Sequence, residues 1–171
     1  MDILETERLI LRELNIDDLT STREIVCDEQ TMYAWNGAWT DEENLEGLKK
    51  QINGYRENGF GRWAVVLKES GKFIGLCGLM WCETDKESLL EIGYLFNRAF
   101  WRKGYATEAA IACKNYAFNV LGYNEVFSII KYNNYNAMNV AIRNGMLVRD
   151  SFIKHYKGVD MLHFVFSVRR V

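Results

Sequence analysis

The sequence predicts an α+β domain, and the order of its segments is the main observation behind this prediction. Alternating or continuously apolar runs, which favour strands, are interspersed with segments whose apolar residues recur at helical spacing. A strand and two helices are followed by several strands, a helix, a strand, a short helix and a final hairpin, which is an α+β order. Composition shows no break along the 171 residues, so we expect a single domain over residues 1–171.

The first predicted strand covers residues 8–13, where apolar and polar side chains alternate. A helix follows to about residue 27. Either Asp17 or Asp18 is expected to cap its N-terminus, because a side-chain oxygen at that point accepts a backbone N–H that has no partner within the helix. Proline is absent, so turns must be made by glycine, asparagine and aspartate.

The second helix begins at a capping-box pattern formed by Thr40 and Glu43, in which each side chain accepts a hydrogen bond from the other residue's backbone N–H. Apolar residues recur at helical spacing behind it, and Asn58-Gly59 is expected to end the helix. The two later helices share a terminating glycine: residues 105–120 before Gly122, and residues 137–144 before Gly145.

The other predicted strands are short runs rich in apolar, β-branched and aromatic residues, bounded by turn residues. One of them, residues 89–96, is apolar apart from Glu91, as expected for a strand covered on both faces. With the first strand they make a sheet of about seven strands: residues 63–67, 72–81, 89–96, 126–131, 148–155 and 161–168.

Composition narrows the class of protein. Apolar residues make up 49% and charged residues 26%, and the formal net charge is −2. This balance argues against nucleic-acid binding, which needs clustered Lys and Arg. No apolar run approaches the length that spans a bilayer, and the N-terminus MDILETERL lacks the features of a secretory signal. We therefore expect a cytoplasmic protein that binds neither membrane nor nucleic acid.

The cysteines and histidines do not predict a metal site. Structural zinc needs ligands at short, paired intervals, and none of these residues has such spacing. Free thiols in a reducing cytoplasm are the expected state. The residues concerned are Cys27, Cys77, Cys82, Cys113, His155 and His163.

The segment from Glu91 to Glu108, EIGYLFNRAFWRKGYATE, carries the strongest functional pattern. It consists of an apolar strand, an aromatic and basic loop, and a glycine that opens a helix. The first N–H groups of a helix lack partners and carry partial positive charge, so an anion such as phosphate binds well there. Gly104 and Ala106 have no bulky side chain to keep a phosphate from the backbone.

Residues 101–109, WRKGYATEA, resemble the acetyl-CoA-binding motif of the GNAT superfamily of N-acetyltransferases. Trp101 stands where that motif usually has Gln or Arg, a variant similar to the RimJ/RimL-like branch. Residues 6–12, 91–94 and 134–146 also resemble segments of that branch, in the same order. The resemblance implies the GNAT fold, a mixed and mostly antiparallel sheet flanked by about four helices, with acetyl-CoA as co-substrate and no metal.

The resemblance implies that backbone N–H groups of the loop and first helical turn bind the pyrophosphate of the cofactor. Without the resemblance, the alternative interpretation is an ordinary loop that turns at glycine and carries basic residues for solubility. The preceding strand is expected to splay from its neighbour, pair with the pantetheine arm and polarise the thioester carbonyl, a contribution of about 3 kcal/mol to the barrier. The implied cofactor-binding residues are Tyr94, Leu95, Phe96, Arg102, Lys103, Gly104, Tyr105, Ala106, Thr107 and Asn134, with Leu95 also catalytic.

Glu91 is the predicted general base. A protonated amine cannot attack a thioester, and burial brings the pKa of a carboxyl closer to the working pH. The alternative is a buried glutamate paired with an arginine or a tyrosine hydroxyl. The family's proton donors to the leaving sulfur fall at Ala137 and Ala141, which have no proton to give, so Tyr135, Asn136 or Asn139 is left to orient a water there.

The acceptor site is predicted from aromatic residues between the first two helices, above all Tyr33 and Trp35, because aromatic walls suit an amine. The same side chains can instead anchor the loop on the core. Glu91 and His155 are expected to complete the pocket, although a lone histidine is more often structural.

The predicted function is acetyl transfer from acetyl-CoA to a primary amine, on a protein N-terminus or a small molecule, by direct attack in a ternary complex. A non-catalytic acyl-CoA sensor is the alternative that Ala137 and Ala141 leave open. The protein is expected to be a monomer or a homodimer. The acceptor itself does not follow from the sequence.

Overall fold

A computed structural model of the chain describes residues 2–171, and these form one eight-stranded mixed sheet in the order β1-β2-β3-β4-β5-β6-β8-β7. The predicted α+β class is confirmed, with eight strands where about seven were expected. The strands are β1 (Asp2–Glu5), β2 (Leu9–Arg12), β3 (Arg62–Leu67), β4 (Phe73–Glu83), β5 (Ser88–Phe96), β6 (Glu125–Lys131), β7 (Leu147–Tyr156) and β8 (Val159–Arg169).

The extra strand is β1, which pairs antiparallel with β2 at the edge of the sheet. It is short and half exposed, with a register shift between Asp2 and Leu4. Four residues of mixed character give too little pattern to predict a strand, and pairing with β2 decides their conformation.

The junction between β5 and β6 interrupts an otherwise antiparallel sheet. These two strands run parallel and share a single residue pair, Glu91 with Phe127. Beyond that pair the strands part, and the Ser128 hydroxyl donates to the carbonyl oxygen of Ile92 at 2.9 Å. From Ile92 onward, the edge of β5 that faces β6 has no partner strand, which leaves room for a ligand beside it.

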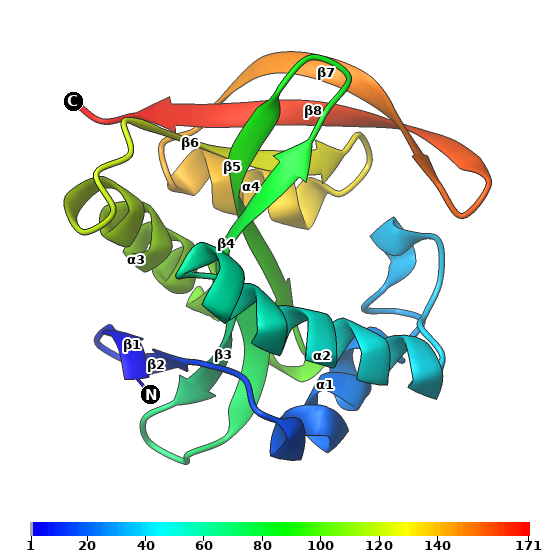
Figure 1. Cartoon of the computed structure of the whole chain (residues 1–171), viewed down its shortest axis with the longest axis vertical. Coiled ribbons are helices and arrows are strands. Elements are labelled where there is room, and N and C mark those ends of the chain that lie inside the picture. Colours follow the sequence, from blue (N-terminus) through cyan, green and yellow to red (C-terminus); the bar gives the residue numbers. More distant parts are fainter. Residues whose placement is uncertain (1) are drawn as a thin grey trace.

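Helices cover both faces of the sheet (Figure 1). On one face, α3 and α4 pack on a core that includes Trp63, Ile92 and Phe96. On the other, α1 and α2 pack over smaller clusters around Leu76 and Leu95. The helices are α1 (Leu19–Val26), α2 (Asp41–Asn58), α3 (Tyr105–Asn119) and α4 (Tyr135–Arg143), with single 3₁₀ turns η1 (Ile16–Asp18), η2 (Tyr33–Trp35) and η3 (Arg98–Phe100).

The predicted cap of the first helix is wrong. Asn15 caps η1, and its side chain accepts from the N–H of Asp17 at 2.8 Å. The Asp18 carboxylate forms an ion pair with Arg12 at 2.7 Å, and no side-chain cap bond is made at the start of α1. Asp18 Oδ2 also accepts from the Asn15 N–H at 2.9 Å, so the Asp18 side chain completes the capping box of η1 and leaves the start of α1 without one.

The capping box of the second helix is confirmed. Thr40 Oγ1 accepts from the N–H of Glu43 at 3.1 Å, and Glu43 Oε2 accepts from the N–H of Thr40 at 2.8 Å. Gly59 ends α2 with φ of +75°, a left-handed conformation that strains other residues. A capping box is read well from sequence because both partners lie within one turn.

Candidate active site

A cleft of about 370 Å³ opens between the free edge of β5, the start of α3 and the face of α4. It brings together most of the residues that the sequence assigned to a ligand site. Those that line it are Tyr33, Trp35, Tyr94, Leu95, Phe96, Arg102, Gly104, Tyr105, Ala106, Thr107 and Asn134. Lys103, Glu91 and His155 are not among its lining residues.

The loop that enters α3 presents its backbone N–H groups to this cleft. Arg102 and Gly104 both have left-handed backbone, with φ of +61° and +82°. Gly104 is the N-cap and makes no side-chain cap bond, and within residues 2–171 the N–H groups of residues 102–107 donate to no protein acceptor. Unpartnered N–H groups at a helix N-terminus make a binding place for an anion.

Trp101 has a structural role that explains its place in the motif. Its indole N–H donates to the carbonyl oxygen of Phe96 at 2.8 Å, where β5 leaves the sheet. The side chain thus fastens the loop to the end of the strand, and the backbone donors that follow keep a fixed position relative to β5. A Gln or Arg side chain is not required for this.

The N-terminal segment holds the first turn of α3 through Glu108. The Glu108 carboxylate accepts from the Thr6 hydroxyl at 2.5 Å, and from the backbone N–H and Nε of Arg8 at 2.9 and 2.7 Å. Burial alone would raise the pKa of Glu108, but these hydrogen bonds outweigh it and keep the pKa below its usual value. Sequence reasoning missed this contact because its members lie about a hundred positions apart.

The same arginine braces the loop. Arg8 Nη1 donates to the Lys103 carbonyl oxygen at 3.0 Å, and its guanidinium lies 4.5 Å from the centroid of the Tyr105 ring. The Lys103 ammonium lies 5.3 Å from the centroid of the Phe100 ring. Lys103 therefore contributes to the loop through its backbone, and its side chain lies over an aromatic ring.

On β5, Tyr94 and Leu95 point to opposite faces of the sheet. The Tyr94 hydroxyl donates to the Ala137 carbonyl oxygen of α4 at 2.7 Å, and burial raises the pKa of Tyr94 far above its usual value. Leu95 packs with Ile25 and Met32 on the α1 side. The backbone between these side chains borders the cleft, as the predicted role of this strand requires.

Asn134 joins the two sides of the cleft. Its Oδ1 accepts from the N–H of Ala137 at 3.3 Å, which caps α4, and from the Tyr33 hydroxyl at 2.7 Å. Burial raises the pKa of Tyr33. A tyrosine from the segment between α1 and α2 thus reaches across the cleft to the start of α4.

Trp35 and Leu95 form a wall shared with a second cavity. This smaller cavity, about 30 Å³, lies between the sheet and the α1–α2 pair, and Arg62 also lines it. The predicted acceptor residue Trp35 therefore lies between the main cleft and the α1–α2 face of the sheet.

Glu91 lies at the point where β5 and β6 separate, outside the lining of the main cleft. Its Oε1 accepts from the backbone N–H of Ile129 at 3.3 Å, two residues beyond the single β5–β6 pair. Burial raises the pKa of Glu91, although Lys154, this N–H and Arg62 act in the opposite direction. Glu91 and Leu95 share the α1–α2 face, because residues at even spacing on a strand lie on one side.

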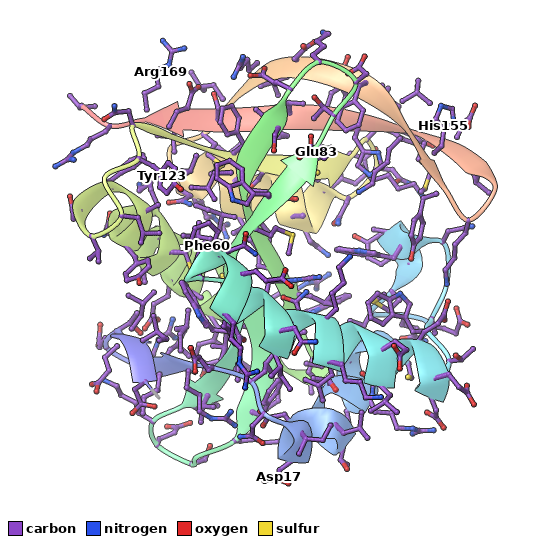
Figure 2. All side chains as sticks on the ribbon, in the orientation of Figure 1. Asp17, Phe60, Glu83, Tyr123, His155 and Arg169 are labelled. Atoms are coloured by element: carbon purple, nitrogen blue, oxygen red, sulfur yellow. The ribbon has the colours of Figure 1, made fainter. Side chains whose placement is uncertain are left out.

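His155 lies away from the cleft, on the outer part of the β7–β8 hairpin (Figure 2). Its side chain is 78% exposed and pairs with Asp160 across that hairpin. The structure does not bring His155 together with Tyr33 and Trp35. Its neighbour Lys154 takes the opposite orientation, since successive side chains alternate across a strand.

Some lining residues were missed by sequence reasoning. Two of them, Val140 and Arg143, lie on the face of α4 that also carries Asn136 and Asn139, so helical periodicity applied to residues 135–143 would have found them. Arg143 is the most significant, because it adds a basic side chain to the cleft beside Arg102. The other missed lining residues are Thr31, between α1 and α2, and Phe100, in η3.

None of the helices within residues 2–171 has the length and hydropathy needed to cross a bilayer. In the same residues, no three His, Cys, Asp or Glu side chains are grouped so that they can hold a metal ion.

Known proteins of one family resemble this chain. The family model for the acetyltransferase (GNAT) domain matches residues 8–147. The Bacillus subtilis protein YkkB is 30% identical over 144 residues, which are 84% of each chain. The N-acetyltransferase YjdG of Bacillus subtilis, named as uncharacterised, is 24% identical over 175 residues, covering 99% of this chain and 100% of its own.

A solved structure agrees with these relatives. An acetyltransferase from Agrobacterium tumefaciens superposes with a TM-score of 0.83 at 25% identity, covering 99% of this chain and 95% of that one. The cleft, the α3 N-terminus and the open β5 edge thus occur in a chain whose sequence and fold both match acetyltransferases. This chain belongs to the GNAT family and is an N-acetyltransferase.

Proposed function

We propose that this protein transfers the acetyl group of acetyl-CoA to a primary amine by direct attack in a ternary complex. One observation carries the proposal. Arg102 and residues 104–107, whose N–H groups have no acceptor within residues 2–171, border one cleft of about 370 Å³ together with the free edge of β5 and Asn134. The diphosphate of acetyl-CoA needs N–H donors, and its extended arm needs a free strand edge to pair with. Its thioester needs a polar group nearby.

The residues present fit acetyl-CoA. Two left-handed residues, Arg102 and Gly104, turn consecutive N–H groups toward one side of the loop, where they can bind a diphosphate. Arg102 and Arg143 add positive charge to the same cleft. When bound, acetyl-CoA supplies an activated acyl group and a thiol leaving group. The backbone at Leu95 is proposed to donate to the thioester oxygen, which gains negative charge during attack.

Glu91 is proposed to accept the proton of the attacking amine, directly or through a water. The amine nitrogen then forms a bond to the acyl carbon, the carbon–sulfur bond breaks, and the sulfur leaves with the bonding electrons. A carboxyl with a raised pKa holds a proton more readily than an ordinary glutamate, which supports this role. Glu91 also lies on the same face of the sheet as Leu95.

Tyr33 is proposed to give the leaving sulfur its proton. The family's usual donor positions fall at Ala137 and Ala141, which have no hydroxyl. The Tyr33 hydroxyl and the Ala137 N–H both donate to Asn134 Oδ1, so a hydroxyl from another segment lies next to one of these positions. A raised pKa keeps Tyr33 protonated at neutral pH, as a proton donor requires. Because acetyl-CoA is used in the cytoplasm, the proposal places the protein there.

The test combines binding with turnover. Calorimetry with coenzyme A measures the cofactor interaction, and thiol release from acetyl-CoA in the presence of single amines measures transfer. The proposal expects binding in the micromolar range and thiol release that depends on the added amine. It is overturned if coenzyme A gives no binding heat. Binding without turnover on any amine would instead favour the acyl-CoA sensor.

A further inference from the structure

Three charged side chains lie on the α1–α2 face of the sheet, each from a different strand. The first, Arg62 on β3, pairs in register with Gly78 of β4, and Gly78 pairs with Gly93 of β5. Residues in register on neighbouring strands share a face, so Arg62 stands at one end of a row that continues in two glycines.

The two glycines leave space for the arginine side chain. A Cβ on Gly78 would come within 2.7 Å of the Arg62 Cα and 2.1 Å of the Gly61 carbonyl oxygen. A Cβ on Gly93 would lie 3.7 Å from Arg62 Cδ. The Arg62 side chain therefore extends across β4 and reaches β5, two residues from Glu91.

The same face carries Lys154. Phe152 on β7 packs with Phe127, Val165 and Leu89 in one cluster. Lys154 follows Phe152 by two residues, and Glu91 follows Leu89 by two, so both side chains lie on the face of that cluster. The charge of Lys154 acts on Glu91 and helps to lower its pKa.

The protein balances the positive charges on this face only in part. The Arg62 Nε is buried and has no hydrogen-bond partner. Within residues 2–171, neither Arg62 nor Lys154 has a carboxylate within ion-pair distance. Burying a guanidinium nitrogen without a hydrogen-bond partner costs free energy, and an anion bound beside it would offset that cost. Glu91 offsets only one of the two charges.

This face adjoins the site of transfer. Arg62 lines the small cavity beneath α1 and α2, and that cavity shares Trp35 and Leu95 with the main cleft. A ligand whose amine lies beside Leu95 would therefore reach toward Arg62 with its remaining groups. The tip of the β7–β8 hairpin is tied to α2 nearby by an ion pair between Lys157 and Glu43, at 3.2 Å.

We propose that the acceptor is a small amine that also carries a carboxylate, such as an amino acid, and that Arg62 and Lys154 bind this carboxylate. The inference rests on the proposed acetyl transfer. Arginine suits the role because its planar guanidinium matches a carboxylate with two parallel hydrogen bonds. Simple amines and polyamines bring only positive charge to a face where two cations share a single carboxylate, Glu91.

The experiment compares matched acceptors. Thiol release is measured with a panel of amino acids and with their carboxamides, which keep the amine and lose the acid. We expect kcat/KM to favour the acid of an accepted pair by about tenfold or more, because a site built for a polar group rejects the analogue that lacks it.

The variants are Arg62→Met and Lys154→Met, with Arg62→Lys as the conservative change. Arg56→Met, an exposed arginine of α2, is the matched control. Arg62→Met is expected to raise KM for the acid by about tenfold or more and to change KM for the carboxamide by less than about threefold. Arg62→Lys restores part of the difference, and the affinity for coenzyme A stays unchanged.

Each failure has a distinct reading. Equal rates on acids and carboxamides in the wild type, or equal losses on both in Arg62→Met, overturn the inference and leave acetyl transfer standing. The inference is also overturned if the protein binds coenzyme A but acetylates no amine that carries a carboxylate. Absence of coenzyme A binding overturns the proposed function itself. If Arg62→Met does not fold, as judged by thermal unfolding, the Lys154→Met data decide.

Discussion

The two halves of the site are built in different ways. The half that faces α3 and α4 consists mainly of backbone: consecutive N–H groups of residues 102–107 and the open edge of β5. The proposed half that faces α1 and α2 consists of side chains from separate strands, Arg62, Glu91 and Lys154, and Trp35 lies between the two halves. Figure 1 shows β5 running between these regions.

The two halves differ in the amino-acid substitutions that they can tolerate. Backbone donors exist whatever the side chain, so the α3 side keeps its chemistry with Trp101 in the place of Gln or Arg. Side-chain groups are lost by a single substitution, so the α1–α2 side can vary its ligand while the fold stays the same. A conserved cofactor and a variable acceptor are the expected result of this arrangement.

The largest effect on catalysis is expected from a substitution of Glu91, which belongs to the half built from side chains. Glu91→Gln keeps an oxygen that can accept the Ile129 N–H but loses the base, so kcat should fall by about 100-fold or more. In the wild type, kcat/KM should rise with pH as Glu91 loses its proton, at a pH above the usual glutamate range, since burial raises its pKa. The variant should lose that limb of the pH profile.

Glu69→Gln, in an exposed turn, serves as the control for this change. A Glu91→Gln enzyme within about threefold of the wild type, with the limb intact, would mean that Glu91 only braces the point where β5 and β6 separate.

The backbone half is tested at Gly104. Gly104→Ala places a Cβ 3.3 Å from Arg8 Nη2 on a residue with φ of +82°, which should displace the loop and weaken coenzyme A binding by roughly 30-fold. Gly122→Ala is the matched control, because Gly122 has a similar φ of +78° and open space around it. Both should lose about 1 kcal/mol of stability, and calorimetry should show weakened binding only in the first. Equal affinities would remove this loop from the cofactor site.

A smaller effect is expected at Tyr33, which crosses between the halves. Tyr33→Phe removes the hydroxyl that donates to Asn134, and kcat should fall by about tenfold, since a thiolate is a good leaving group even without an acid. Coenzyme A affinity should change by less than about threefold. Solvent-isotope effects on kcat would check the proton step, and an unchanged kcat would exclude Tyr33 as the donor.

The smallest effect concerns the brace of the α3 N-terminus. Glu108→Gln should lower the free energy of unfolding by about 1 kcal/mol at neutral pH, a modest value because the pair with Arg8 is partly exposed. The folded-state pKa of Glu108 is lowered, so its stabilisation is present above the usual glutamate pKa and is lost as pH falls through the folded value. The difference between variant and wild type should therefore vanish in acid.

Denaturant unfolding at several pH values measures this difference, with the exposed neighbour Glu7→Gln as control. A constant difference at all pH values would mean that the charge of Glu108 does not contribute.

Sequence reasoning succeeded where the partners lie close together in the chain. The Thr40–Glu43 box and the loop before α3 are contiguous, and their geometry follows from local backbone rules. It failed where a contact with another element decides, even when that element lies only a few residues away. The Asp18 side chain pairs with Arg12 and accepts from the Asn15 N–H, so it caps η1 and not α1, and β1 forms by pairing with β2.

The acceptor side shows the same limit most clearly. His155 was predicted to close the pocket, whereas its side chain is exposed and pairs with Asp160, and the register of β7 and β8 places its neighbour Lys154 on the α1–α2 face of the sheet. A shift of one residue moves a side chain to the other side of a sheet, and register depends on pairing over long separations. Likewise, Arg62 reaches β5 only because Gly78 and Gly93 on the neighbouring strands leave space for its side chain.

The sequence by itself determined the α+β class, the family and the segment that presents backbone donors, because these depend on periodicity and on short contiguous patterns. Only the tertiary structure decided which charges meet on the α1–α2 face, and that Tyr33 reaches Asn134. The physical reason is that strand register and helix packing bring distant residues together, and single-chain patterns carry little information about such pairs.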